Sequence, residues 1–177
     1  PRAISGLGFS PEQAARITPG VVYVTPSDYG HSGPWGERRG FDSLVQSTTG
    51  FNHAEGQAAG VDGPKELPAQ MLDHATGYFM AFGAMMAKAR QAREGGSWHV
   101  QVSLAQTGRW LWNLGRVSEG FAAADLKAEA VTPYIEEMPS GFGLLRAIRH
   151  SALLSKTPAF WARPAMPLGS HPAQWPA

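Results

Sequence analysis

Asp73 is well placed to do chemistry, because it opens a long segment of helical pattern at 70–92. An aspartate in the first turn of a helix lies beside unpaired N–H groups and the positive end of the helix dipole, which favour its ionised form. A carboxylate held there can act as a nucleophile. The apolar residues of the segment recur three and four positions apart, which predicts a face turned toward a core: Met71, Ala75, Tyr78, Phe79, Phe82, Met85, Met86 and Ala89.

Each of these features also has a purely structural interpretation. Acidic residues are common in first turns, where they cap or solvate the start of a helix. The small and apolar neighbours of Asp73, from Ala75 to Phe79, are suited to a dry wall around a reacting carboxylate. Gly77 and Gly83 are equally suited to the close approach of another helix. Residue types alone leave both interpretations open.

The surrounding sequence predicts the elements that would position Asp73. They are strand 21–25, helix 41–50, helix 70–92, strand 98–104 and helix 105–118. Trp98, Val100 and Val102 alternate along the second strand, as expected for a strand with one buried face. Helix 105–118 carries its apolar residues at helical spacing, which we interpret as core: Trp110, Leu111, Leu114 and Val117. Strands joined through helices predict an α/β fold with a Rossmann-like layer of parallel strands.

Composition excludes several classes of function. The 177 residues include no cysteine, which removes disulfides and thiolate chemistry and suits the cytoplasm. The net charge is +1 and the basic residues are scattered, so nucleic-acid binding is not expected. No apolar run reaches the roughly 18 residues of a membrane span. The six histidines are dispersed, so no metal site is predicted.

Three segments together resemble one family. The first runs from Tyr29-Gly30-His31-Ser32-Gly33-Pro34 through Gly40-Phe41-Asp42 to Gln46 and Gly50; the second is Asp73 with Thr76-Gly77; the third runs from Arg93-Glu94 to Ser103-Leu104. Their order and spacing resemble the family III CoA-transferases, which include formyl-CoA and carnitine CoA-transferases and the related α-methylacyl-CoA racemases. The resemblance covers roughly residues 1–115, with a weaker similarity at 165–172.

The resemblance implies a reaction and a site. By resemblance Asp73 is the nucleophile that attacks an acyl-CoA thioester and then carries CoA as an aspartyl thioester, which a carboxylic acid acceptor attacks. Asp28, Tyr29 and Gly30 match the loop that approaches CoA and the acyl group. CoA would be a substrate, and no bound cofactor is expected.

Two other functions stay open. The racemases of this family carry a histidine at the position of Phe41, and they need it as a base. Because phenylalanine cannot carry a proton, CoA transfer is favoured over racemisation. A non-catalytic chain that keeps the fold as an interaction subunit is the remaining alternative, and it would tolerate the change of Asp73 to asparagine.

The two ends of the chain are interpreted through the same resemblance. We expect residues 1–120 to be the second half of a CoA-transferase large domain, and the chain to be a fragment of a longer protein. Residues 121–177 would be a reduced second segment with a Pro-rich arm, for which Trp161 and Trp175 are apolar anchors. Gly141 and Gly143 are interpreted as a turn before a helix. Pairing as a homodimer, or with a missing N-terminal half, is expected.

Overall fold

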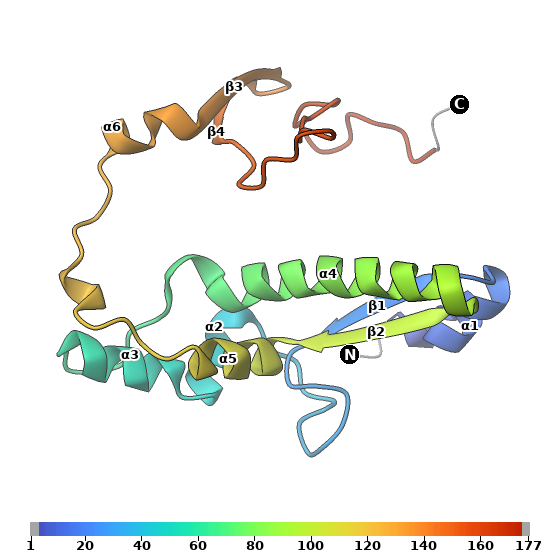
Figure 1. The fold of residues 1–177 in the computed structure, drawn as a ribbon, viewed down its shortest axis with the longest axis horizontal. Coiled ribbons are helices and arrows are strands. Elements are labelled where there is room, and N and C mark those ends of the chain that lie inside the picture. Colours follow the sequence, from blue (N-terminus) through green and yellow to red (C-terminus); the bar gives the residue numbers. More distant parts are fainter. Residues whose placement is uncertain (1–3, 175–177) are drawn as a thin grey trace. The chain divides into compact units, whose positions relative to one another are not determined.

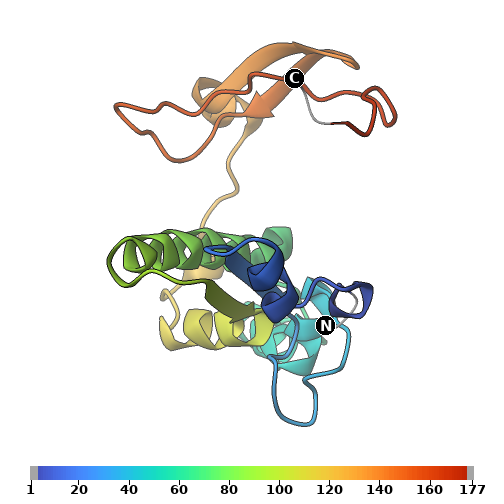
Figure 2. The same cartoon turned by 90° about the vertical axis from the view of Figure 1, so that its right-hand side faces the viewer.

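A computed structural model describes residues 4–174, and the chain divides after Ala122 into two compact units. The elements of the first unit are η1 (Ser5–Leu7), α1 (Pro11–Ile17), β1 (Val22–Ser27), α2 (Asp42–Thr48), α3 (Phe51–Ala59), η2 (Pro68–Gln70), α4 (Met71–Glu94), β2 (Trp98–Ser103), α5 (Leu104–Asn113) and η3 (Gly120–Ala122). Those of the second are α6 (Ala128–Val131), η4 (Thr132–Tyr134), β3 (Ile135–Ser140) and β4 (Gly143–Ile148). Figures 1 and 2 show both units.

The first unit is built on a parallel pair of strands. Val22 of β1 lies opposite Trp98 of β2, and Ser27 lies opposite Ser103. Parallel neighbours require a crossover, and here the chain between the strands forms α2, α3 and α4. Figure 1 shows α4 running along both strands, with which it is in contact. The predicted α/β class with parallel strands is confirmed.

The two strands differ in how they are buried. In β2, Trp98, Val100 and Val102 are half-buried while the residues between them are exposed, as the alternation predicted. In β1, by contrast, the residues from Val22 to Thr25 are all half-buried. Both strands end in a buried serine at the same edge of the sheet.

α4 occupies the predicted helical segment but turns a different face to the sheet. Its buried residues are Leu72, Thr76 and Ala87, and a Cβ atom on Gly83 would lie only 2.6 Å from Cγ1 of Val100. Small side chains are what allow a helix to lie so close to a strand. Much of the predicted apolar stripe is consequently exposed: Tyr78 65%, Phe82 58%, Met85 64% and Met86 47%. The prediction that this stripe faces a core was therefore wrong.

The other helices depart from the predicted bounds at glycines. Gly50, with φ 86°, separates α2 from α3, which the sequence analysis did not predict. α5 ends at Asn113, and Gly115 follows with φ 79°. Leu114 and Val117, which were interpreted as core, are 63% and 85% exposed.

The buried core joins three elements at the start of α4. Val45 of α2, Leu72 of α4 and Leu104 of α5 form its centre. Half-buried side chains packed against it are Tyr29, Leu67, Ala105 and Leu111. Burying a large aliphatic side chain contributes about 1.5–3 kcal/mol, so this cluster ties the first turn of α4 to α2 and α5.

The second unit is a small antiparallel hairpin followed by a segment without regular elements. β3 and β4 pair from Ile135 with Ile148 to Ser140 with Gly143, and an ion pair of 2.9 Å joins Glu137 to Arg146. Gly141 thus belongs to the turn of a hairpin, not to the start of a helix, and that prediction was wrong because the segment after it alternates as a strand. None of the described residues of this unit is buried. Trp161 is 68% exposed, and Trp175 lies outside the described residues.

Candidate active site

Asp73 lies in the first turn of α4, as predicted, and its side chain is exposed. The turn that leads into the helix is unusual. Ala69 has φ 54° and Gln70 has φ 49°, so two consecutive residues with side chains adopt the left-handed conformation. Each such residue costs roughly 1–2 kcal/mol relative to an ordinary conformation, and outliers of this kind cluster at functional sites.

Two buried side chains of α2 hold this turn. The backbone N–H of Asp73 donates to Oδ2 of Asp42 at 2.8 Å, and the N–H of Leu67 donates to Oε1 of Gln46 at 2.8 Å. The amide of Gln46 also donates to Oδ1 of Asp42. Asp42 is 0% exposed and Gln46 is 2% exposed. Both residues were part of the family resemblance, but no role had been predicted for either.

The surroundings of Asp73 make its carboxyl group harder to ionise. Partial desolvation raises its pKa, and the neighbouring carboxyls of Asp42 and, to a lesser degree, Asp28 raise it further, whereas His74 acts in the opposite direction. The sequence analysis expected the helix dipole to favour the ionised form. The shift that desolvation and like charge produce is in the opposite direction.

The predicted dry wall does not form around this carboxylate. Ala75 and Phe79 are half-buried, but Gly77 and Tyr78 are exposed, as Asp73 itself is. A Cβ on Gly77 would meet no atom within 4 Å, and Gly83 approaches a strand instead of another helix. Close packing, the structural interpretation of the two glycines, therefore applies to Gly83 alone, and its neighbour is β2.

The three predicted binding residues follow β1 directly. The Asp28 carboxylate accepts a hydrogen bond of 2.8 Å from the N–H of Gly40, and the Asp28 carbonyl accepts one of 2.9 Å from the N–H of Ala105. Tyr29 packs against the core, and its ring meets that of Trp35 edge to face. Gly30 has φ 100°, a conformation that favours glycine.

A groove of about 570 Å³ lies beside β2. Its apolar lining comes from Phe79, Val100, Val102 and Trp110, and its polar lining includes Ser103 and Thr107. Among the four predicted site residues, Gly30 lines the groove, and Asp28, Tyr29 and Asp73 do not. The structure therefore places Asp28 close enough to act on the charge of Asp73, but it does not gather all four residues around one cavity.

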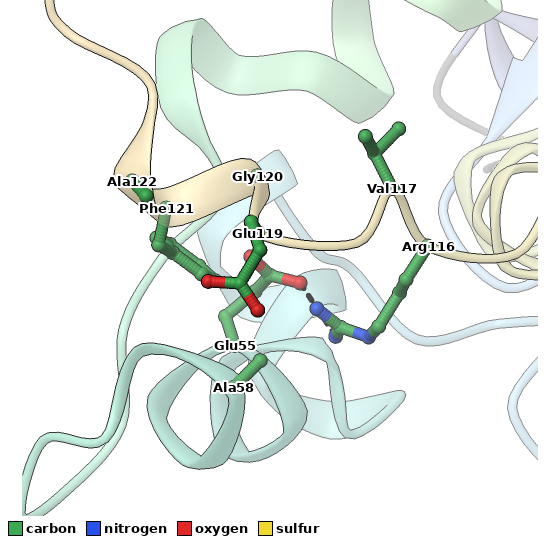
Figure 3. A pocket seen from close by; sticks show the side chains of 8 residues that line it. All are labelled: Glu55, Ala58, Arg116, Val117, Glu119, Gly120, Phe121 and Ala122. Atoms are coloured by element: carbon green, nitrogen blue, oxygen red, sulfur yellow. Dashed lines mark ion pairs between the residues drawn. The ribbon is translucent and has the colours of Figure 1, made fainter.

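A separate pocket of about 500 Å³ lies where α3 meets the segment after α5. Figure 3 shows Arg116 and Glu55 pointing toward one another across it, and their charged groups are 2.6 Å apart. Ala58 and Phe121 add apolar surface. None of the predicted site residues lines this pocket. Across residues 4–174, no group of three or more His, Asp or Glu side chains is arranged to hold a metal ion.

Comparison with known proteins decides the family. Residues 1–127 match CoA-transferase family III. The chain belongs to that family. Succinyl-CoA:glutarate CoA-transferase of Mus musculus is 34% identical over 87 residues, which are 49% of this chain and 19% of the mouse protein. Acetyl-CoA:oxalate CoA-transferase of Acetobacter aceti is 31% identical over 106 residues, which are 59% of this chain and 26% of that enzyme.

The fold is shared with a protein of solved structure. A CAIB/BAIF family protein from Brucella suis superposes with a TM-score of 0.56 at 19% identity, over 80% of this chain and 38% of that protein. The chain spans about a fifth to a quarter of the length of the two curated relatives.

Within the described residues, no helix has the length and apolar character that crossing a membrane requires.

Proposed function

We propose that the protein transfers CoA from an acyl-CoA donor to a carboxylic acid acceptor, with Asp73 as the nucleophile. The observation that carries this proposal is the placement of Asp73. In a family III chain, its backbone is held by a buried carboxylate directly after a strained turn. The two curated relatives support the class of reaction, since each is named for CoA transfer to a dicarboxylic acid.

The chemistry proceeds through two anhydrides and one thioester. The Asp73 carboxylate attacks the thioester carbonyl of the donor, the C–S bond breaks, and CoA leaves as a thiolate. The thiolate then attacks the aspartyl carbonyl of the mixed anhydride, which releases the donor acid and leaves an aspartyl-CoA thioester. The acceptor carboxylate attacks that thioester, and the released thiolate attacks the acceptor carbonyl of the second anhydride. The products are the new acyl-CoA and free Asp73.

The electrostatics of Asp73 suit this role. A carboxylate whose pKa is raised is a stronger nucleophile once it is ionised, and perturbed pKa values are typical of catalytic groups. Asp28, Tyr29 and Gly30 are the residues that we propose approach CoA, because they follow the carboxyl end of β1, the edge of a parallel sheet where ligands bind.

The side chain of Phe41 disfavours racemisation, as the sequence analysis already indicated. It directly precedes Asp42, and the residue is 79% exposed. An apolar ring there can remove no proton from the carbon next to the thioester. We therefore propose transfer and not racemisation.

Trapping of the covalent intermediate tests the proposal. The full-length protein is incubated with a panel of acyl-CoAs that includes succinyl-CoA and acetyl-CoA, treated with borohydride or hydroxylamine, and measured by intact-protein and peptide mass spectrometry. We expect a modification at Asp73 that is absent from Asp73→Asn. Asp62→Asn, which changes an exposed aspartate of a loop, is the matched control.

The same experiment distinguishes CoA transfer from the alternative of a non-catalytic interaction subunit. If no donor gives an adduct or any acyl exchange, and Asp73→Asn leaves every measured property unchanged, the proposal fails and the chain is an interaction subunit that keeps the fold.

A further inference from the structure

The turn before α4 needs an external restraint. Ala69 and Gln70 both have positive φ, although neither is glycine. A conformation of this kind persists only where the surrounding contacts impose it. Asp73 lies three residues after Gln70, so its direction depends on how this turn is fixed.

The restraint comes from one face of α2. Gln46 accepts from the N–H of Leu67, before the strained pair, and Asp42 accepts from the N–H of Asp73, after it. Residues 42 and 46 are one helical turn apart, and the hydrogen bond from Gln46 to Asp42 joins them. The two side chains therefore hold both ends of the strained turn, and neither is accessible to solvent.

We propose that Asp42, supported by Gln46, is a positioning residue for the reaction of Asp73. This inference rests on the proposed function and deepens it. The Asp42 carboxylate fixes the backbone of Asp73 by its hydrogen bond, and it places a second negative charge beside the nucleophile. The charged or titratable groups that act on Asp73 are Asp42 of α2, Asp28 of the loop after β1, and His74 of α4 itself.

A purely structural role would give a different result. Asp42 would then hold α2 against α4 for the sake of the fold, and any variant that folds would react at the normal rate. A positioning role requires that a folded variant binds acyl-CoA but reacts slowly, because small displacements of a reacting group cost large factors in rate.

The test uses Asp42→Asn in the full-length protein, with Asp62→Asn as the matched control. The rate of Asp73 modification is measured against acyl-CoA concentration and against pH. We expect the maximal rate to fall about 10-fold or more, with the half-saturating concentration changed less than about twofold, as for an interaction that acts in the reaction step. The acidic midpoint of the rate should move to lower pH, since the like charge that raises the pKa of Asp73 is gone. A folded variant with the normal rate and midpoint would overturn the inference.

A second variant covers the case in which Asp42→Asn does not fold. Gln46→Met keeps the charge of Asp42 but removes the hydrogen bonds to Leu67 and Asp42. We expect a slower reaction with an unchanged pH midpoint, and a normal rate would again overturn the inference. If the unmodified protein gives no adduct at Asp73, the proposed function itself fails, and with it any positioning role. An adduct that forms equally fast in the variants overturns only the positioning role.

Discussion

The first turn of α4 and the middle of the same helix are held by different kinds of contact. At the start, the contacts are hydrogen bonds. Asp42 accepts one from the backbone N–H of Asp73, and Thr76 shares a buried one of 2.7 Å with Thr107. Farther along, Gly83 lies directly against the side chain of Val100. Hydrogen bonds have preferred directions, whereas close packing of small residues only limits distance. The candidate nucleophile lies at the end that is fixed in direction.

Glycine substitutions at two points of α4 test the packed region and should give the largest effect. Gly83→Ala places a Cβ atom 2.6 Å from Val100, whereas Gly77→Ala meets open space. Both changes gain the same helix propensity of about 1 kcal/mol. We therefore expect Gly83→Ala to be less stable than Gly77→Ala by about 1–3 kcal/mol, the usual cost of overpacking.

Urea unfolding of the two glycine variants measures this difference directly. If the additional truncation Val100→Ala restores most of the loss in Gly83→Ala, the clash is its cause. Equal stabilities of the two single variants would show that α4 does not depend on close contact with β2.

Removal of a hydroxyl tests the hydrogen-bonded region. Thr76→Val keeps the shape of the side chain but leaves the buried hydroxyl of Thr107 without its partner. The expected loss is about 1–2 kcal/mol. The double variant with Thr107→Val should recover part of it, because no unpaired hydroxyl then remains. A Thr76→Val protein as stable as the unmodified one in chemical denaturation would contradict this account.

Glycine at the strained turn should act in the opposite direction. Gln70→Gly relieves the cost of positive φ, and we expect a gain of about 0.5–1 kcal/mol after the larger chain entropy of glycine is included. Gln57→Gly in α3 is the matched control, and it should lose about 1 kcal/mol because residue 57 is helical. Thermal unfolding of both proteins gives the comparison, and a loss at both positions would show that residue 70 is unstrained.

The smallest effect concerns charge. The pKa of Asp73 is raised in the folded chain, so its ionised form lowers stability at neutral pH. That cost shrinks as pH falls through the folded pKa and disappears below the unfolded one. Asp73→Asn should therefore be at least as stable as the unmodified protein at neutral pH, with a gain within about 0.5 kcal/mol because the site is exposed. The two should converge at acidic pH when unfolding is followed by fluorescence; an asparagine variant clearly less stable at neutral pH would contradict the sign.

Local sequence patterns predicted the elements that position Asp73. The alternation from Trp98 to Val102 predicted β2. The unbroken helical segment predicted α4, with its C-terminal end placed within two residues of the observed one. Ser10 and Gln13 form a capping box at the start of α1, a signal that was present in the sequence but not used. α3 was not predicted, for two reasons. Gly50 was interpreted as the end of the preceding helix, and Phe51 is the only large apolar residue among 51–59, so no apolar periodicity indicated a further helix.

The parts that could not be predicted depend on contacts between distant segments. The apolar stripe of α4 carried the stronger pattern, yet Gly83 lies against the sheet, where only a small side chain fits, and Ala87 is the small residue buried farther along the helix. Asp42 and Gln46 were visible as polar residues four apart on a helix. Their burial depends on Leu67 and Asp73, which lie 21 and 31 residues farther along the chain.

The long separation in sequence between α2 and the start of α4 affects the order in which the parts of the site can form. The helix that carries Asp73 can form from its own sequence within about a microsecond, but its first turn has no intrinsic preference for the conformation at Ala69 and Gln70. The carboxylate acquires its direction only when α2 docks and closes a loop of 31 residues. Closing such a loop carries an entropic cost before any contact repays it, so a chain in which only the helix has formed does not yet fix the direction of the candidate nucleophile. The orientation of residue 73 is thus a property of the assembled tertiary structure, and it depends on complete folding more strictly than helix content does.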